Sequence, residues 1–449
     1  MSFSTDDTIV AIATPPGRGG IGVVRISGPE APRIAMALTG QLSFQPRHAT
    51  LVRVGGAGAH DRAIVISFPA PASYTGEEVV EISAHGSPVL LNAIVGAAVQ
   101  SGARLAEPGE FTLRAYLHGR MDLVQAEAVQ DLVDAVTPLQ ARTAFDQLEG
   151  TLTQRIAAID ATLFDLSARV EASLDFPGEG YHFVEPDAVA SEIGGVIASI
   201  DTLLGDARTG RLVREGAQVA IVGRPNAGKS TLFNSLAGAG RAIVTEIPGT
   251  TRDLLTEQID LQGIAITLID TAGIRQTTND VVEAEGIARA RSAAGVAHLV
   301  IVLIDASRLL EDDDRLLLAS TVTTPRVVVY SKADLPAAWT DDLDVRDAVA
   351  VSAATGAGMD VLRQTIVEAL GLEENHRDTP AITNIRHVDL LRRARAALDR
   401  GREAAAQGMP EELVSADLAD ARASLEAITG RRTADDTLNA IFARFCIGK

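Results

Sequence analysis

Residues 223–230 read Gly-Arg-Pro-Asn-Ala-Gly-Lys-Ser and fit the pattern G-x-x-x-x-G-K-[ST] of a phosphate-binding loop. The run 219–222 before it is short, apolar and β-branched, which predicts a buried strand. Residues 231–236 follow with helical spacing. A strand, a glycine loop and the start of a helix together place several backbone N–H groups around one anion. This stretch therefore predicts a nucleotide-phosphate site at its centre.

Four residues of the loop have predicted roles that follow from their chemistry. Gly223 and Gly228 allow backbone conformations that a Cβ would hinder. Lys229 is expected to reach the β- and γ-phosphates, and the Ser230 hydroxyl is expected to ligate Mg²⁺. The alternative, a chance glycine loop between a strand and a helix, has to explain this whole context.

Length and charge bound the class of protein. A chain of 449 residues is too long for one typical core and predicts two to four domains. The formal net charge is −19, so any contact with RNA must be local or shared with a partner. Six arginines between 386 and 402 offer one local candidate, and a solvated helix face is the alternative. The single cysteine, the absence of about 18 consecutive apolar residues and the acidic first residues predict a cytoplasmic protein without a membrane span.

The hydrophobic pattern divides the chain into four segments. Residues 1–118 predict mixed α and β structure, 119–215 a helical segment, 216–370 an α/β sheet domain, and 371–449 a second helical segment. We expect the α/β domain to be inserted into one helical domain. The predicted strands are 8–13, 21–26, 63–68, 79–82, 219–222, 264–269, 299–304, 327–329 and 348–351. The predicted helices are 29–38, 87–100, 123–136, 148–174 and 187–214.

Four further motifs follow the loop in the order expected of a guanine-nucleotide domain. Asp270-Thr271-Ala272-Gly273 ends an apolar strand, where the aspartate can hold Mg²⁺ through water and the glycine amide can sense the γ-phosphate. The segment 249–253, with its two threonines, can complete the Mg²⁺ shell. Ser331-Lys332-Ala333-Asp334 offers a carboxylate to a guanine edge, and Ser352-Ala353-Ala354 offers a backbone N–H.

This order resembles a Ras-like GTPase, with two departures. Ser331 stands where such enzymes usually carry Asn. This departure removes a side-chain amide that is expected to connect the base loop, residues 331–334, to the phosphate loop, residues 223–230. Ile274 stands where Ras-type enzymes carry a water-orienting Gln, and no arginine finger can be identified. Hydrolysis therefore needs another positive charge and another group that orders water.

The whole chain resembles the MnmE (TrmE) family of tRNA modification GTPases. The sequence motifs that carry this resemblance are here called marks. Besides the loop and 249–253, they are Pro15–Gly20, Glu107–Phe111, Leu123–Ala128 and the terminal Phe445–Lys449. The resemblance implies an N-terminal α+β domain similar to tetrahydrofolate-binding domains, which also dimerises, a discontinuous helical domain and the inserted GTPase domain.

The resemblance also implies an activity and partners. A homodimer would form a heterotetramer with the FAD-dependent protein MnmG. Together they would add a carboxymethylaminomethyl or aminomethyl group to C5 of the wobble uridine, U34, of certain tRNAs. The one-carbon unit would come from 5-formyl- or methylene-tetrahydrofolate, contacted by Arg25, Glu81, Arg120 and Lys449. Arginine and lysine suit the carboxylates of folate, and Glu81 suits the donor edge of its pterin.

Further site residues follow from the resemblance. The K⁺ ligands would be Asn226, Thr245, Ile247 and Thr250, and the Mg²⁺ ligands Ser230 and Thr251. Glu283 matches the family's water-orienting glutamate, although the nearby Glu285 is a second acid, and Cys446 is either a nucleophile or a packed side chain. The implied GTP-binding set is Asn226, Ala227, Gly228, Lys229, Ser230, Thr231, Thr245, Glu246, Ile247, Pro248, Gly249, Thr250, Thr251, Asp270, Thr271, Ala272, Gly273, Ser331, Lys332, Ala333, Asp334, Ser352, Ala353 and Ala354.

Two other functions stay open at this point. One is a regulatory GTPase that associates with RNA or the ribosome and catalyses no modification, against which the folate-like region and the Cys-Ile-Gly-Lys end argue. The other is a folate-dependent aminomethyltransferase in which GTP hydrolysis is only regulatory.

Overall fold

The computed structural model describes residues 6–56, 58–175, 185–239, 241–242, 255–270, 297–338, 348–371 and 382–448. The chain forms two compact units. The first comprises residues 1–130, 147–190 and 396–449, and the second comprises 131–146 and 191–395.

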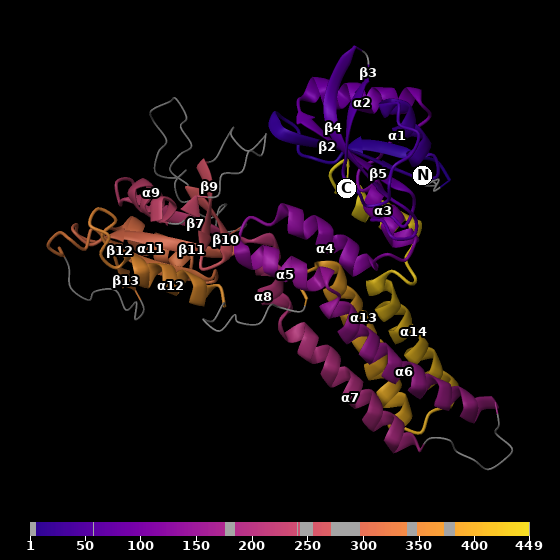
Figure 1. The fold of residues 1–449 in the computed structure, drawn as a ribbon. Helices are drawn as coiled ribbons and strands as arrows, with labels where there is room; N and C mark the ends of the chain where they lie inside the picture. Colours follow the sequence, from indigo (N-terminus) through magenta and orange to yellow (C-terminus); the bar gives the residue numbers. More distant parts are fainter. Residues whose placement is uncertain are drawn as a thin grey trace. The chain divides into compact units, whose positions relative to one another are not determined.

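The first unit contains a six-stranded sheet in the order β3-β4-β5-β2-β1-β6. Neighbouring strands are antiparallel except β1 and β6, which are parallel. One face carries α1 (Ala31–Thr39) and α2 (Pro88–Gln100), whose apolar side chains join the strands in one buried cluster (Figure 1). The strands are β1 (Ile9–Ile12), β2 (Gly19–Ser27), β3 (Thr50–Gly56), β4 (Ala59–Phe68), β5 (Val79–Gly86) and β6 (Arg104–Leu105).

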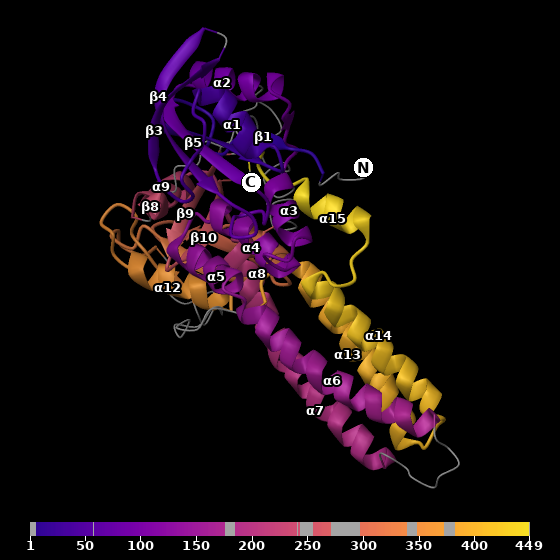
Figure 2. The same cartoon turned by 45° about the vertical axis from the view of Figure 1, so that its right-hand side comes forward.

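Helices complete the first unit. The long α6 (Thr151–Asp175) lies beside α14 (Glu411–Thr429), as both ribbon views show (Figures 1 and 2). Arg422 of α14 donates to Asp160 of α6 at 3.0 Å. The shorter α3 (Glu110–Leu117) and α15 (Asp435–Phe442) also contact each other.

The second unit contains a seven-stranded sheet in the order β13-β12-β11-β7-β10-β9-β8. The five strands β13, β12, β11, β7 and β10 run parallel, while β9 and β8 add an antiparallel edge. The strands are β7 (Ala217–Gly223), β8 (Arg241–Ala242), β9 (Leu255–Leu261), β10 (Ile264–Asp270), β11 (Leu299–Asp305), β12 (Arg326–Ser331) and β13 (Val349–Ala350).

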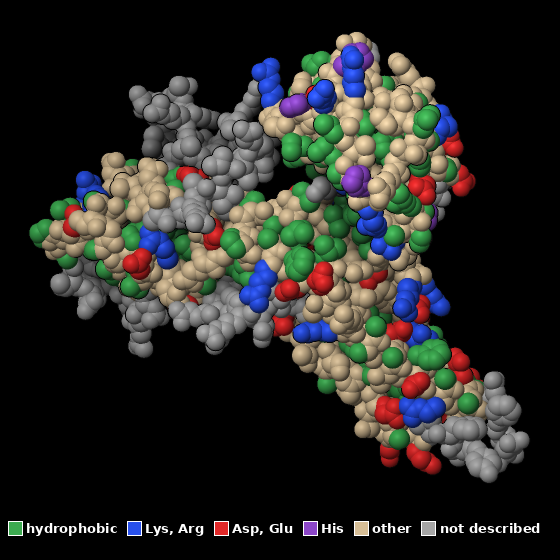
Figure 3. All heavy atoms as spheres, in the orientation of Figure 1, with side chains coloured by type: hydrophobic (Ala, Val, Ile, Leu, Met, Phe, Trp, Pro, Cys, Tyr) green, Lys and Arg blue, Asp and Glu red, His purple; other side chains and the backbone are tan. Residues whose placement is uncertain are grey.

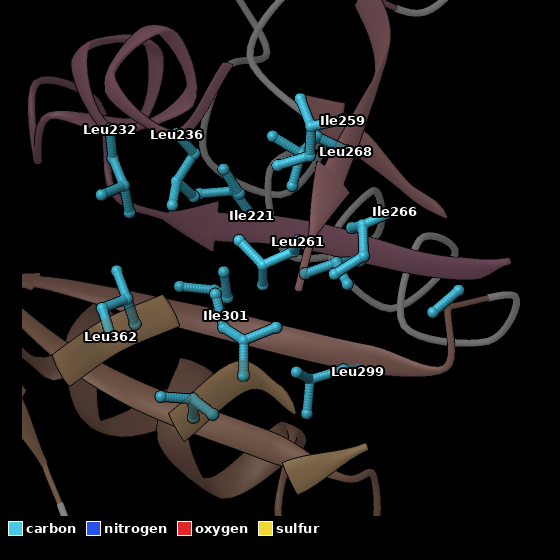
Figure 4. Close-up of a cluster of buried hydrophobic side chains, with 14 of the residues drawn as sticks. Ile221, Leu232, Leu236, Ile259, Leu261, Ile266, Leu268, Leu299, Ile301 and Leu362 are labelled. Carbon is cyan, nitrogen blue, oxygen red and sulfur yellow. The ribbon is translucent and has the colours of Figure 1, made fainter. Parts of the chain in front are cut away.

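Both faces of this sheet are covered, which explains its nearly continuous apolar strands. Ile221 and Ile301 point into the cluster shared with α9 (Lys229–Ala239) and α12 (Met359–Ala369) (Figure 4). Their neighbours Val222 and Val302 point into the opposite cluster, with α11 (Asp312–Ser320). The α/β architecture predicted for this part of the chain is confirmed.

Five further helices are α4 (Leu123–Asp134), α5 (Pro138–Leu148), α7 (Pro186–Gly205), α8 (Ala207–Glu215) and α13 (Ile385–Ala406). The combined stretch Pro186–Glu215 is long and apolar enough to cross a membrane by length and composition alone. Its buried positions recur every three or four residues, from Val189 through Ile193 and Ile200, as in the core helix of a globular protein.

The structure corrects several predicted elements. Leu148 was predicted to begin the long helix 148–174 but instead ends α5, a helix that was missed, because Gly150 takes a left-handed conformation with φ of 86° before α6 begins. The helix predicted over 187–214 is divided at Asp206 into α7 and α8. Strands β3 and β9 were also missed, although each alternates buried apolar residues with more exposed ones.

Four of the six arginines of α13 are paired with acids. Arg393 lies 2.7 Å from Asp389, and Arg395 lies 2.6 Å from Asp201. Arg400 and Arg402 likewise contact acidic side chains. In Figure 3, acidic and basic side chains are interspersed over the helices drawn toward the lower right. These contacts favour a solvated helix face over a concentrated RNA-binding patch.

Candidate functional site

The nucleotide motifs meet at one edge of the second sheet. The parallel register places Gly223 of β7 beside Leu303 of β11, and Asp270 of β10 beside Ile221 of β7. Asp305 of β11 pairs with Ser331 of β12. Because these strands all end at the same edge, the loops that follow them form one cluster, where ligands of open α/β sheets bind.

The phosphate loop has the backbone that its glycines predict. A Cβ on Gly223 would lie 2.6 Å from the Leu303 carbonyl oxygen, so this position excludes larger residues. Asn226 and Gly228 have φ of 64° and 97°, and the chain then enters α9 at Lys229. Such a loop turns successive N–H groups toward a common centre and forms an anion-binding concavity.

The Lys229 side chain folds back over the loop. Its ammonium group donates to the carbonyl oxygens of Gly223 at 2.8 Å and Arg224 at 2.7 Å, and the residue is buried. Asn226 and Ser230 are exposed on the same loop. The fixed ammonium and the two accessible polar side chains suit an anion with its metal counter-ions.

A partner of the phosphate loop was missed in the sequence. Arg224 contacts Glu311 and lies 3.4 Å from Asp314, both at the start of α11. These acids form a capping box on α11, in which the Glu311 side chain accepts from the Asp314 N–H and the Asp314 carboxylate accepts from the Glu311 N–H. The signal was the run of acids Glu311–Asp314, which sequence alone cannot connect to Arg224.

The predicted base loop is anchored to its neighbours. Lys332 has φ of 58°, and its ammonium group lies 2.6 Å from Oδ2 of Asp305. Burial alone would raise the pKa of Asp305, but hydrogen bonds from Lys332 and Ser307 outweigh it and leave the pKa below its usual value. Asp334 is exposed, where its carboxylate can meet a ligand.

The sequence interpretation of Ser331 needs correction. Its hydroxyl donates to the Ala227 carbonyl oxygen at 2.7 Å, so a tie between the base loop and the phosphate loop is present without the usual amide. Following β13, the N–H of Ser352 donates to Ala357 at 2.9 Å. A backbone donor to a base therefore has to come from Ala353 or Ala354.

Several predicted site residues lie outside the described part of the chain. They are Thr245, Glu246, Ile247, Pro248, Gly249, Thr250, Thr251, Thr271, Ala272, Gly273, Glu283 and Lys449. For Asp270 the structure describes the strand position but not the side chain. Within the described residues, no group of three or more His, Cys, Asp or Glu side chains forms a metal site.

The first unit brings two predicted folate contacts together. Arg25 of β2 and Glu81 of β5 are register neighbours, and Nη2 of Arg25 lies 2.8 Å from Oε1 of Glu81. The guanidinium carbon of Arg25 lies 5.1 Å from the ring centroid of Tyr74 and 5.6 Å from that of Phe111. Burial raises the pKa of Tyr74 above its usual value. This corner combines a charged pair with flat apolar surfaces, as a ring-bearing ligand requires.

The end of the chain docks beside this corner. Phe445 is buried with Leu113 of α3 and Leu123 of α4. The backbone then pairs Ile447 with Pro108, and the Gly109 N–H donates to Cys446 at 3.4 Å. Cys446 itself is exposed, so the interpretation of this cysteine as a packed side chain is wrong.

The terminal segment 445–448, called the tail below, reaches β1, the strand that pairs with β2 beside Arg25. A Cβ on Gly448 would lie 3.0 Å from the backbone of Ile12 and Ala13, and Gly448 has φ of 100°. In the register of β1 and β2, Ala11 is the neighbour of Arg25. The last described residue of the chain is therefore only a few residues from the predicted folate contacts, although the sequence separates them widely.

A buried charge network supports the same region. Arg114 of α3 is 1% exposed, donates to Glu110 at 3.0 Å and contacts Glu77 at 3.1 Å and Asp7. Arg104 donates to Glu110 at 2.7 Å. Burial alone would raise the pKa of Glu110, but hydrogen bonds from Arg104, the Glu107 N–H and Arg114 hold it below its usual value. The mark Glu107–Phe111 therefore also has a structural role, because its Glu110 belongs to this buried charge network, which the sequence alone does not reveal.

Comparison with known proteins covers the chain almost completely. Residues 8–120 match the family model of the GTP-binding protein TrmE N-terminus, and residues 123–446 match that of the MnmE helical domain. The tRNA modification GTPase MnmE of Laribacter hongkongensis is 44% identical over 449 residues, covering 99% of each chain. That of Koribacter versatilis is 43% identical over 455 residues, covering 100% of each chain.

Two solved structures show similarity to part of the chain. Aquifex aeolicus Era bound to GDP·AlF4⁻ is 26% identical, covers 40% of this chain and 66% of its own, and gives a TM-score of 0.27. The G domain of the T. maritima FeoB iron transporter is 27% identical, covers 34% of this chain and 98% of its own, and gives 0.26. Because the curated relatives exceed 40% identity over nearly the full length, the chain belongs to the MnmE (TrmE) family of tRNA modification GTPases and is a GTP-hydrolysing enzyme.

Proposed function

We propose that this chain hydrolyses GTP to drive modification of the wobble uridine U34 of certain tRNAs. Working as a homodimer with MnmG, it adds a carboxymethylaminomethyl or aminomethyl group to C5. The one-carbon unit comes from tetrahydrofolate, while MnmG carries FAD. The observation that carries this proposal is the docking of the terminal segment beside Arg25 and Glu81, which gathers this family's N-terminal and C-terminal marks at one place.

The folate corner has a chemical basis in the described residues. Both contacts from Arg25 use Oε1 of Glu81, so Oε2 can accept from the donor edge of a pterin. Since these side chains touch, they serve the same end of the ligand. Arg120 and Lys449 are then left for the distant carboxylates. Arg120 follows α3, and its side chain passes close to Gly76. A Cβ added to Gly76 would lie 3.3 Å from Cγ of Arg120.

The nucleotide site belongs to the second unit. A GTPase of this kind uses Mg²⁺, for which we assign Ser230 and Thr251. We assign K⁺ to Asn226, Thr245, Ile247 and Thr250, in place of an arginine finger. Neutral oxygens suit this larger cation, and the exposed side chain of Asn226 on the phosphate loop can contribute one. Glu283 orders the attacking water, and dimerisation of the GTPase domains stimulates hydrolysis.

The proposed domain division keeps 1–118 as the folate-binding and dimerisation domain and 216–370 as the GTPase domain. Segments 119–215 and 371–449 together form the helical domain. We place the protein in the cytoplasm, where its tRNA substrate is modified. The exposed thiol of Cys446 is accessible for chemistry but its role is left unassigned.

Mass spectrometry of wobble uridines from cells lacking this protein tests the proposal. The C5 group should disappear and return when the wild-type chain is supplied. Lys229→Ala should not restore it, because the γ-phosphate charge is left unneutralised. Arg315→Ala, which removes an exposed cation of α11 in the same unit, is the matched control and should restore it. Unchanged uridines in the deletion strain would favour a regulatory GTPase without modification chemistry.

A further inference from the structure

The Ser331 hydroxyl lies between the two nucleotide loops. Ser331 ends β12 and is 6% exposed. Its Oγ is 2.7 Å from the Ala227 carbonyl oxygen and 3.2 Å from that of Ile304. A hydroxyl has one proton to donate, and the shorter contact is the better hydrogen bond. The side chain therefore commits its donor to the phosphate loop.

The bond to Ala227 fixes a peptide group that belongs to the phosphate-binding backbone. The peptide between Ala227 and Gly228 is planar and trans, so its C=O and N–H point in opposite directions. With the carbonyl held toward Ser331, the Gly228 N–H is turned away from the base loop. In a loop of this pattern, that side is where backbone N–H groups surround the phosphates. The hydroxyl thereby orients a donor that it does not itself touch.

The base loop has separate means of meeting a base. Asp334 is exposed, three residues beyond Ser331. Lys332 is held by Asp305, and the Ala333 N–H donates to Val351 at 3.0 Å. These contacts fix the loop that carries Asp334 without using the Ser331 hydroxyl. Base choice and phosphate positioning are thus assigned to different side chains of one tetrapeptide.

We propose that Ser331 is a positioning residue for the phosphates of the nucleotide and contributes nothing to base selection. The inference rests on the proposed nucleotide site at 223–230. Removing the hydroxyl frees the Ala227–Gly228 peptide, so every nucleotide with the same phosphates loses affinity equally. A base-reading residue would instead change the preference among nucleotides.

Dissociation constants of GTP and inosine triphosphate, measured calorimetrically on the full chain, test this inference. Inosine triphosphate lacks the 2-amino group that a carboxylate would bind, so the ratio of the two constants measures base reading. Ser331→Ala should weaken both nucleotides about tenfold, the effect of leaving a buried carbonyl without its donor, and keep the ratio constant. Ser331→Thr retains the hydroxyl and should restore most of the affinity.

Ser320→Ala is the matched control in the same unit. It removes a hydroxyl-to-carbonyl hydrogen bond of 2.9 Å within α11, away from the nucleotide loops, and should change neither constant. A changed ratio in Ser331→Ala would overturn the inference, as would affinities equal to those of Ser320→Ala. Equal losses in Ser331→Thr and Ser331→Ala would assign the effect to packing and also overturn it. If Lys229→Ala binds GTP like the wild type, the proposed site itself is wrong.

Discussion

Gly448→Ala should detach the terminal tail while leaving the rest of the fold intact. Gly448 has φ of 100°, which costs a residue with a Cβ about 1–3 kcal/mol. The added carbon would also lie 3.0 Å from the Ile12 carbonyl carbon and closer to its oxygen. Relaxing to an ordinary carbon–oxygen distance needs a displacement of roughly 1 Å.

The contacts that hold the tail are too weak to resist this displacement. The Gly109 N–H to Cys446 distance is already 3.4 Å, at the limit of a hydrogen bond, and Ile447 is 60% exposed. Such a bond contributes about 1 kcal/mol. Phe445 stays buried with Leu113, so the free energy of global unfolding should change by less than about 1 kcal/mol. The docked position of the tail, by contrast, should no longer be favoured over the detached one.

Cys446 provides the assay because it is the only cysteine of the chain and is exposed. A dye attached there should show lower fluorescence anisotropy in Gly448→Ala than in the wild type, and folate titration should weaken while GTP hydrolysis is unchanged. Gly40→Ala is the control, since Gly40 also has a positive φ, of 68°, but no atom lies within 4 Å of the new Cβ. Wild-type anisotropy in Gly448→Ala would refute the docking argument, whereas normal detachment with unchanged folate binding would refute only the ligand assignment.

Three further predictions concern nucleotide choice, cation and pH. Asp334→Asn should weaken GTP and improve xanthosine triphosphate, whose extra carbonyl complements an amide donor, and an unchanged preference would exclude Asp334 as base reader. The GTPase rate should rise steeply with K⁺ but hardly with Na⁺ at equal ionic strength, and Asn226→Ala should lose this response while still binding nucleotide; equal rates in both salts would contradict the cation assignment. The pKa of Glu110 is lowered in the folded state, so its stabilisation is complete above the unfolded pKa and is lost as pH falls through the folded one. Glu110→Gln should therefore cost about 3 kcal/mol of unfolding free energy at pH 7, and in chemical denaturation the difference from wild type should shrink below about pH 4; a constant difference would contradict the network.

Sequence patterns predicted the nucleotide domain well because its signals are local. The glycine loop, the apolar strand before it and the helix after it determine one another over a few residues, and the parallel register then collects the later motifs at one edge. The effect of Ser331 was not predictable in the same way. The residue type indicated a lost amide, but only the position of the Ala227 carbonyl shows that a hydroxyl can supply the hydrogen bond.

The charge network shows a second limit. Arg104, Glu110 and Arg114 are close in sequence, and Glu110 and Arg114 are one helical turn apart on α3, yet their partners Asp7 and Glu77 come from two other places in the chain. No periodicity connects those positions, since long-range ion pairs depend on how strands and helices pack. Helix α5 was missed for a related reason, because its apolar side chains continue the spacing of α6 across the turn at Gly150.

The mark Glu107–Phe111 and the described part of the terminal mark, residues 445–448, are parts of one contact. Gly109 has φ of 68°, and a Cβ there would lie 2.7 Å from the Phe442 carbonyl oxygen and 2.9 Å from Phe445. Its N–H also donates to Cys446. The next residue, Glu110, locks the turn to α3 through Arg114. Gly109 therefore holds the terminal segment against α3, and the Glu110–Arg114 pair fixes the turn that carries Gly109, so two motifs distant in sequence meet in one contact.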